Sequence, residues 1–188
     1  MKNLRRGRAA VILFPALRQC SNVVRNSLLQ MSTVDKFIET FLPPQTFQHR
    51  KDGPYLDQID SLSSSEKIEF EEKLIDRVNS KIFDSWVVEA LTYLKSFKSL
   101  PSLYNLLSKT KEKNARIIIA SSIYQIHPDI TMCDIIFEES KSIKDKYALI
   151  GLFYFMARVN DERLNAFIRQ FHEDPDLLLS YNSKQWVK

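Results

Sequence analysis

The sequence predicts an all-α protein, and three observations lead to that prediction. Apolar residues recur at helical spacing from Ser65 onward, and no stretch alternates apolar and polar residues as a half-buried strand does. Glycine occurs only three times in 188 residues, whereas folds built from tight β-hairpins need residues that adopt positive φ. Capping residues and prolines divide the apolar pattern into segments of helical length.

The N-terminal part of the chain predicts one helix followed by irregular structure. Ser32 and Thr33 offer a hydroxyl cap ahead of an apolar-periodic run that begins at Val34. Three prolines, a glycine and three serines occur within positions 43–64, which favours an irregular connector. The expected organisation is therefore a separate segment at 1–30, a helix and connector at 31–64, and a helical repeat domain at 65–188.

Helix starts and stops follow one another through this domain. Pro101 suits a first turn, where its missing N–H costs nothing, and Pro128 ends the helix that precedes it. The predicted starts are Ser65, Asp84, Ser99, about Asn114, Ile130, Asp145, Asn160 or Asp161, and Asp174-Pro175. The predicted core positions include Ile68, Leu74, Trp86, Phe97, Leu103, Leu106, Ile130, Cys133, Leu164 and Ile168.

The predicted helices recur in pairs about thirty residues apart. Shifting the numbering by that amount places Leu103 on Cys133, and Ala120 on Ile150. Two antiparallel helices cannot enclose a core by themselves, so neighbouring pairs must stack. The sequence therefore predicts a short superhelical array of antiparallel helix hairpins.

The best-formed pair, residues 100–126, resembles a HEAT-type α-solenoid repeat. It has a Pro-bearing first helix with a leucine stripe, and its second helix begins near Arg116, with Ala120 and Ile123 at the small and aliphatic places. The resemblance extends over roughly 66–172, although Lys146 replaces the arginine in the next pair. It implies a HEAT-like array whose second helices line the concave side.

The resemblance also identifies candidate binding residues on these second helices. The places expected to be exposed are Ile117, Ser121, Tyr124, Gln125, Tyr147, Gly151, Tyr154 and Phe155. They are rich in aromatic residues, which dominate interface hot spots. We therefore predict that Tyr124, Gln125, Tyr147, Tyr154 and Phe155 bind a partner. The alternative is that the C-terminal helix and Trp186 cover this face, because segment 147–156 is apolar nearly all round.

No residue pattern points to catalysis, a cofactor or a metal. The three histidines have no second ligand at a helical spacing, and the two cysteines, Cys20 and Cys133, match no zinc motif. Cys133 lies in an apolar stripe, which favours burial over reactivity. We expect a non-catalytic module that binds another protein through the concave face, as an adaptor, an assembly factor or an immunity or inhibitor-type protein.

The charge distribution bears on the alternatives. The net charge of +4 arises from the first 34 residues, which hold six Lys or Arg and no acid, so the remainder carries −2. A nucleic-acid-binding HEAT-like protein is the alternative, but it would need a basic concave face. The apolar run at 9–17 is shorter than the about 20 residues that span a bilayer. We expect a cytoplasmic protein, or a mitochondrial or exported one if residues 1–30 are a targeting leader.

Overall fold

All regular structure in the described part of the chain is helical, which confirms the predicted class. The computed structural model describes residues 31–44, 53–80 and 82–187, so the predicted leader at 1–30 lies outside the described residues. Two 3₁₀ helices, η1 (Leu56–Ser61) and η2 (Phe97–Ser99), accompany the α-helices. The α-helices are α2 (Thr33–Phe41), α4 (Ser64–Asn79), α5 (Ser85–Tyr93), α6 (Leu100–Lys109), α7 (Lys113–Ile126), α8 (Ile130–Ser140), α9 (Lys146–Ala157), α10 (Glu162–Arg169) and α11 (Leu177–Trp186).

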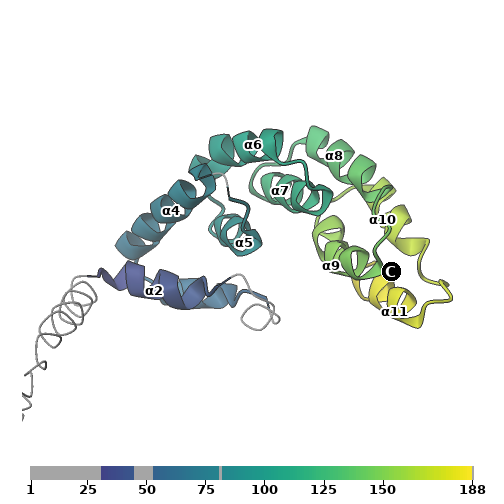
Figure 1. Cartoon of the computed structure of the whole chain (residues 1–188), viewed down its shortest axis with the longest axis horizontal. Helices are drawn as coiled ribbons and strands as arrows, with labels where there is room; N and C mark the ends of the chain where they lie inside the picture. The colour runs from purple at the N-terminus through teal and green to yellow at the C-terminus, as the bar shows by residue number, and fades with distance from the viewer. Residues whose placement is uncertain (1–30, 45–52, 81, 188) are drawn as a thin grey trace, which may run out of the picture.

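From α4 onward the helices follow an arc in two rows (Figure 1). The outer row holds α4, α6, α8 and α10, and the inner row holds α5, α7, α9 and α11. Each inner helix packs against its inner neighbours, and α7 also contacts α6 and α8. Helix α2 packs on α4 at one end of the arc. None of these helices combines the length and apolar character needed to cross a membrane.

Side chains at the predicted caps set most helix starts. Ser32 and Asp35 form a reciprocal capping box at α2. Asp84, Asp145 and Asp161 each accept a hydrogen bond from a backbone N–H in the first turn of the helix that follows, and Pro101 lies in the first turn of α6. These starts confirm the sequence prediction, because a cap acts within three residues of the chain.

Two predicted starts are wrong by two residues. Ser63, not Ser65, caps α4, because Glu66 stands three residues after Ser63 and completes a capping box. Asp176, not Asp174, caps α11, because its carboxylate accepts from two backbone N–H groups of the first turn. The connector predicted to be irregular contains η1, whose Ile59 is fully buried and which packs on α5.

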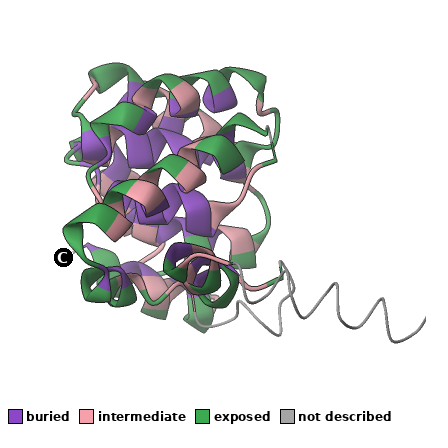
Figure 2. Cartoon of the chain, turned by 90° about the vertical axis from the view of Figure 1, so that its left-hand side faces the viewer, coloured by how far each residue is buried: buried purple, intermediate pink, exposed green. Residues whose placement is uncertain are grey.

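The core lies between the two rows, where the buried residues gather (Figure 2). Leu74, Leu103 and Cys133 are fully buried, as predicted. Three predicted core residues are instead exposed: Ile68, Phe97 and Ile130. In α4 the buried face runs through Phe70, Leu74 and Val78 at a spacing of four residues, and Ile68 falls outside that stripe.

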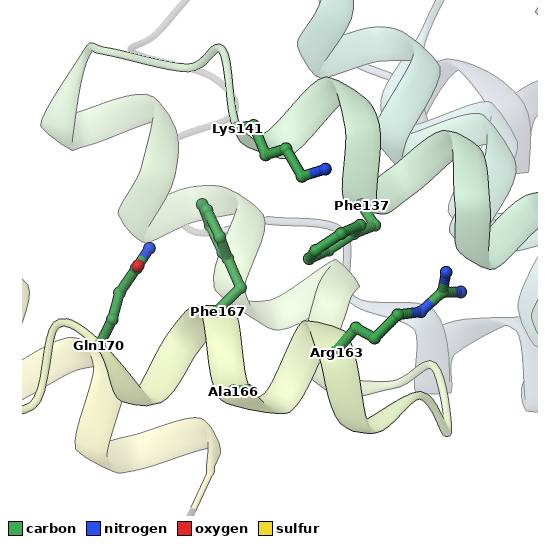
Figure 3. A pocket seen from close by; sticks show the side chains of 6 residues that line it. All are labelled: Phe137, Lys141, Arg163, Ala166, Phe167 and Gln170. Carbon is green, nitrogen blue, oxygen red and sulfur yellow. The ribbon is translucent and has the colours of Figure 1, made fainter.

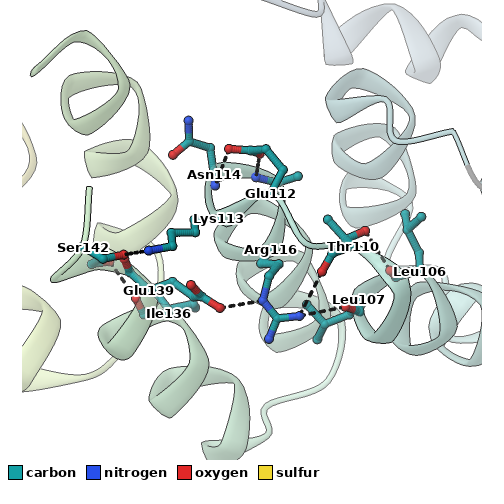
Figure 4. A network of polar contacts seen from close by, with 12 residues as sticks. Leu106, Leu107, Thr110, Glu112, Lys113, Asn114, Arg116, Ile136, Glu139 and Ser142 are labelled. Carbon is teal, nitrogen blue, oxygen red and sulfur yellow. Dashed lines mark hydrogen bonds and ion pairs between the residues drawn. The ribbon is translucent and has the colours of Figure 1, made fainter. Parts of the chain in front are cut away.

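Arg116 joins one helix pair to the next (Figure 4). Its Nη1 donates to the carbonyl oxygens of Leu107 and Thr110, at 3.0 and 3.2 Å, at the end of α6. Its Nε donates to Glu139 of α8 at 2.6 Å. About three quarters of each of the two charged side chains is shielded from solvent. The arginine therefore fixes the α6–α7 loop and ties that pair to the outer helix of the following pair.

We expect Arg116→Ala to lower the free energy of unfolding by about 2–3 kcal/mol, because two carbonyls and a shielded carboxylate lose their donor. Arg116→Lys should recover only part of the loss, since an ammonium cannot reproduce the fork of the guanidinium. Urea unfolding measures both effects. Arg169→Ala is the control: Arg169 pairs with the exposed Glu162, so its removal should cost less than about 1 kcal/mol. Equal losses for the two alanine variants would contradict this role.

Candidate functional site

Three inner helices are joined by polar contacts at their C-terminal ends. Lys95, which follows α5, donates from Nζ to the carbonyl oxygen of Gln125 at 2.7 Å. The Gln125 amide in turn donates to the carbonyl oxygen of Arg158, which follows α9. Helix carbonyls at a C-terminus lack intrahelical donors, so these two side chains satisfy such groups and hold the three ends in line.

Tyr154 lies at the centre of an aromatic group on the inner row. Its ring meets Phe155 and Trp186 edge to face, with centroid separations of 4.9 and 5.3 Å. The Arg158 guanidinium lies 4.9 Å from the centre of the same ring and donates to the tyrosine hydroxyl at 2.8 Å. The contact with Trp186 of α11 agrees in part with the alternative that the C-terminal helix covers this face, yet Trp186 is itself 43% exposed.

The five predicted binding residues are not equally accessible. Tyr147 is 67% exposed, Tyr124, Gln125 and Tyr154 are half-buried, and Phe155 is buried. Contacts link Gln125, Tyr154 and Phe155 through Arg158 and the Tyr154 ring. Tyr147 and Tyr154 are seven residues apart on α9 and so lie on one face, about two turns from each other. The structure thus brings Gln125, Tyr154 and Phe155 together, whereas the Tyr147 side chain is exposed to solvent.

Besides Phe155, two positions that the sequence places on the exposed face are buried. Ile117 and Ser121 of α7 are almost completely shielded from solvent. The Ser121 hydroxyl donates to the carbonyl oxygen of Phe155 at 2.7 Å, directly across the contact between α7 and α9. The expectation that Ser121 would be exposed is wrong, because α9 packs against this side of α7.

The sequence analysis missed Glu89, a buried carboxylate on α5. Glu89 is only 8% exposed, but its carboxylate oxygens are not fully enclosed, because His172 Nε2 is the one fully buried and unpaired side-chain polar atom of the described residues. Burial raises the pKa of Glu89 to about 7, and the positive charge of Arg158 lowers it by a smaller amount. Burial also raises the pKa of Tyr154, and the charge of Glu89 adds to that rise. Glu89 therefore belongs to the same site as Tyr154 and Arg158. The signal was present, because Glu89 interrupts the otherwise uncharged run 85–94.

A groove of about 640 Å³ lies between α8 and α10 of the outer row (Figure 3). Phe137 and Phe167 line it, and Lys141 lies above the Phe137 ring at 4.1 Å. The two cations at this groove are already paired: Lys141 with Glu138, and Arg163 with Asp134 and Asp161. The groove therefore has an apolar lining, and both of its cationic side chains are neutralised by neighbouring carboxylates.

The described residues contain neither a candidate metal site nor a cysteine suited to thiol chemistry. No group of three or more His, Cys, Asp or Glu side chains there is placed to hold a metal ion. Cys133 is fully buried, as predicted, and burial raises the pKa of its thiol, which disfavours the reactive thiolate. His127 ends α7 and Asp129 caps α8, so the His-Pro-Asp segment serves as a helix boundary.

Comparisons of this chain with protein-family models, with curated proteins and with solved structures find no match.

The raised pKa of Glu89 predicts a specific pH dependence of stability. The folded state holds this proton more tightly than the unfolded state does, so stability falls as pH rises from about 4.5 to about 7 and then levels off. Glu89→Gln removes the ionisation. We therefore compare the free energies of unfolding of Glu89→Gln and of the unmodified protein. The value for the variant minus the value for the unmodified protein should be about 2–3 kcal/mol larger at pH 8 than at pH 5. Urea unfolding at both pH values measures this gap. Glu72 is exposed, so Glu72→Gln is the control and its stability difference from the unmodified protein should not change with pH. If the stability difference for Glu89→Gln is the same at pH 5 and pH 8, the prediction is wrong.

The burial of Ser121 leads to a second prediction. Ser121→Arg would force a long cation between α7 and α9, and should lower the free energy of unfolding by about 3–5 kcal/mol. Tyr147→Arg places the same side chain on the exposed part of the inner row and should change stability by less than about 0.5 kcal/mol. Thermal melts compare the two. A larger loss for Tyr147→Arg would show that the two faces are assigned the wrong way round.

Proposed function

We propose that the chain is a non-catalytic helical-repeat protein of the HEAT-like type that binds another protein through its inner row. The observation that carries this proposal is the aromatic surface around Tyr154, where Trp186 and Tyr147 remain accessible on two inner helices. Large aromatic side chains that stay accessible beside fixed polar groups are typical of interface hot spots.

Equivalent contacts between successive helix pairs support the repeat part of the proposal. Lys113, the first residue of α7, donates from Nζ to Ser142, which lies shortly before α9. Lys146, the first residue of α9, donates in the same way to Asp176, the N-cap of α11. In both cases the first lysine of an inner helix contacts the segment that leads into the next inner helix. The recurrence of this contact favours an array in which each helix pair contacts its neighbours.

Photo-crosslinking tests the interaction surface. A photoreactive phenylalanine at position 147 or 154, in the full chain expressed in its native cells, should yield a covalent adduct with one defined protein. The same residue at position 130, which is 68% exposed at the start of outer-row helix α8, is the control. Adducts from the inner positions alone are the expected result. Adducts of equal yield from position 130, or none from either inner position, would refute the assignment of the inner row as the binding surface.

A further inference from the structure

Two successive loops that lead from an outer to an inner helix carry exposed lysines at one edge of the arc. The loops are residues 110–112, between α6 and α7, and 141–145, between α8 and α9. Lys113 Nζ donates to the Ser142 hydroxyl at 2.7 Å and so joins them (Figure 4). Four exposed lysines without a carboxylate partner among the described residues lie in or beside these loops: Lys109, Lys111, Lys113 and Lys144. We call this set the lysine edge.

The carboxylates of the same two loops are already engaged. Glu112 accepts from two backbone N–H groups of the first turn of α7, at 2.9 and 2.5 Å, and Asp145 accepts from one at α9, at 2.8 Å. The positive end of each helix dipole also offsets these two charges. Glu138 and Glu139 each pair with a basic side chain. The lysine edge therefore has a surplus of positive charge, although the chain after residue 34 carries −2.

The lysine edge is continuous with the proposed binding surface. Lys146 directly follows the second loop, and its Nζ lies 5.3 Å from the centre of the Tyr147 ring. The Tyr147 side chain is 67% exposed at the start of α9. A partner that contacts Tyr147 therefore also meets the lysine edge, where acidic groups on the partner would be attracted.

The chemistry of the edge favours carboxylates over the phosphates of nucleic acids or lipids. Its arginine, Arg116, is held by Glu139 and two carbonyl oxygens, so it cannot offer the fork that suits phosphate. Neither loop holds an aromatic residue on which a base could stack. The next loop from outer to inner row, residues 170–176, holds three acidic residues and no Lys or Arg. It would repel an extended anionic surface but leaves room for a short acidic segment.

We propose that the lysine edge binds an acidic segment of the partner protein, whose Asp or Glu side chains lie against the four lysines. This inference rests on the proposed function and names the chemistry of the partner. Lysine ammonium groups on long stems can follow the carboxylates of such a segment without a fixed geometry. The adjoining part of the partner contacts Tyr147 on the inner row.

The test titrates the full chain into a fluorescein-labelled oligoglutamate peptide and follows fluorescence anisotropy at low salt, with oligoglutamine as the uncharged control peptide. The edge variant combines Lys109→Gln, Lys111→Gln and Lys144→Gln, and leaves Lys113 in place because it joins the two loops. This variant should bind oligoglutamate at least about tenfold more weakly. Arginine at the same three positions should keep the affinity within about twofold, because the charge is retained.

A matched control variant removes the same charge elsewhere. It combines Lys36→Gln, Lys98→Gln and Lys184→Gln, which are exposed positions on α2, η2 and α11. Its affinity should change by less than about twofold, because salt screens distant surface charges. The first 34 residues hold six other basic side chains, so all titrations are repeated in chains with Arg5→Gln and Arg8→Gln. The difference between the edge and control variants should persist there.

The proposal is wrong if oligoglutamate binds no better than oligoglutamine, or if the edge and control variants lose affinity equally. It is also wrong if oligouridylate or phosphatidylserine vesicles bind more tightly than oligoglutamate through the same three lysines, which would assign the edge to a nucleic acid or a membrane. Photo-crosslinks from positions 147 and 154 separate this proposal from the proposed function. Adducts of unchanged yield in the edge variant refute only the acidic chemistry. If oligoglutamate binds at the edge but no adduct forms, the proposed function fails instead.

Discussion

Burial of α7 on several sides is the constraint on which the rest of the structure depends. This helix packs against α6 and α8 of the outer row and against α5 and α9 of the inner row. Eight of its residues are buried: Ala115, Ile117, Ile119, Ala120, Ser121, Ser122, Ile123 and Ile126. Because the interior is close-packed, small side chains are needed where α9 approaches. Ser121 meets this need, and its hydroxyl finds an acceptor on α9.

The placement of the candidate site follows from that contact. With α9 held against α7, the C-terminal ends of α5, α7 and α9 align, and Lys95 and Gln125 can donate to the next helix end. The alignment brings Arg158 and Tyr154 near Glu89, which lies 65 residues or more earlier in the chain. Arg116 fixes the outer side of the same pairs through Glu139. A rigid frame of this kind keeps interface side chains in place before a partner arrives, which lowers the entropic cost of binding.

Glu89 lowers the stability of this frame when its carboxyl group is ionised. A glutamine at this position would relieve the cost of burying a charge, so the native residue lowers stability above about pH 5. Residues that weaken the folded state without a structural gain are typical of functional sites.

The sequence by itself determined the helical class, most helix starts and the aromatic character of the inner row. Those features depend on residues within a few positions of one another, as with Asp84 and Asp161 at their caps. Only the tertiary structure decided which faces are covered. Ile117 and Ser121 are buried because α7 is covered on more than one side, so no single apolar stripe marks its face. The environment of Glu89 was likewise set by helices distant in sequence, since burial and charge act through space rather than along the chain.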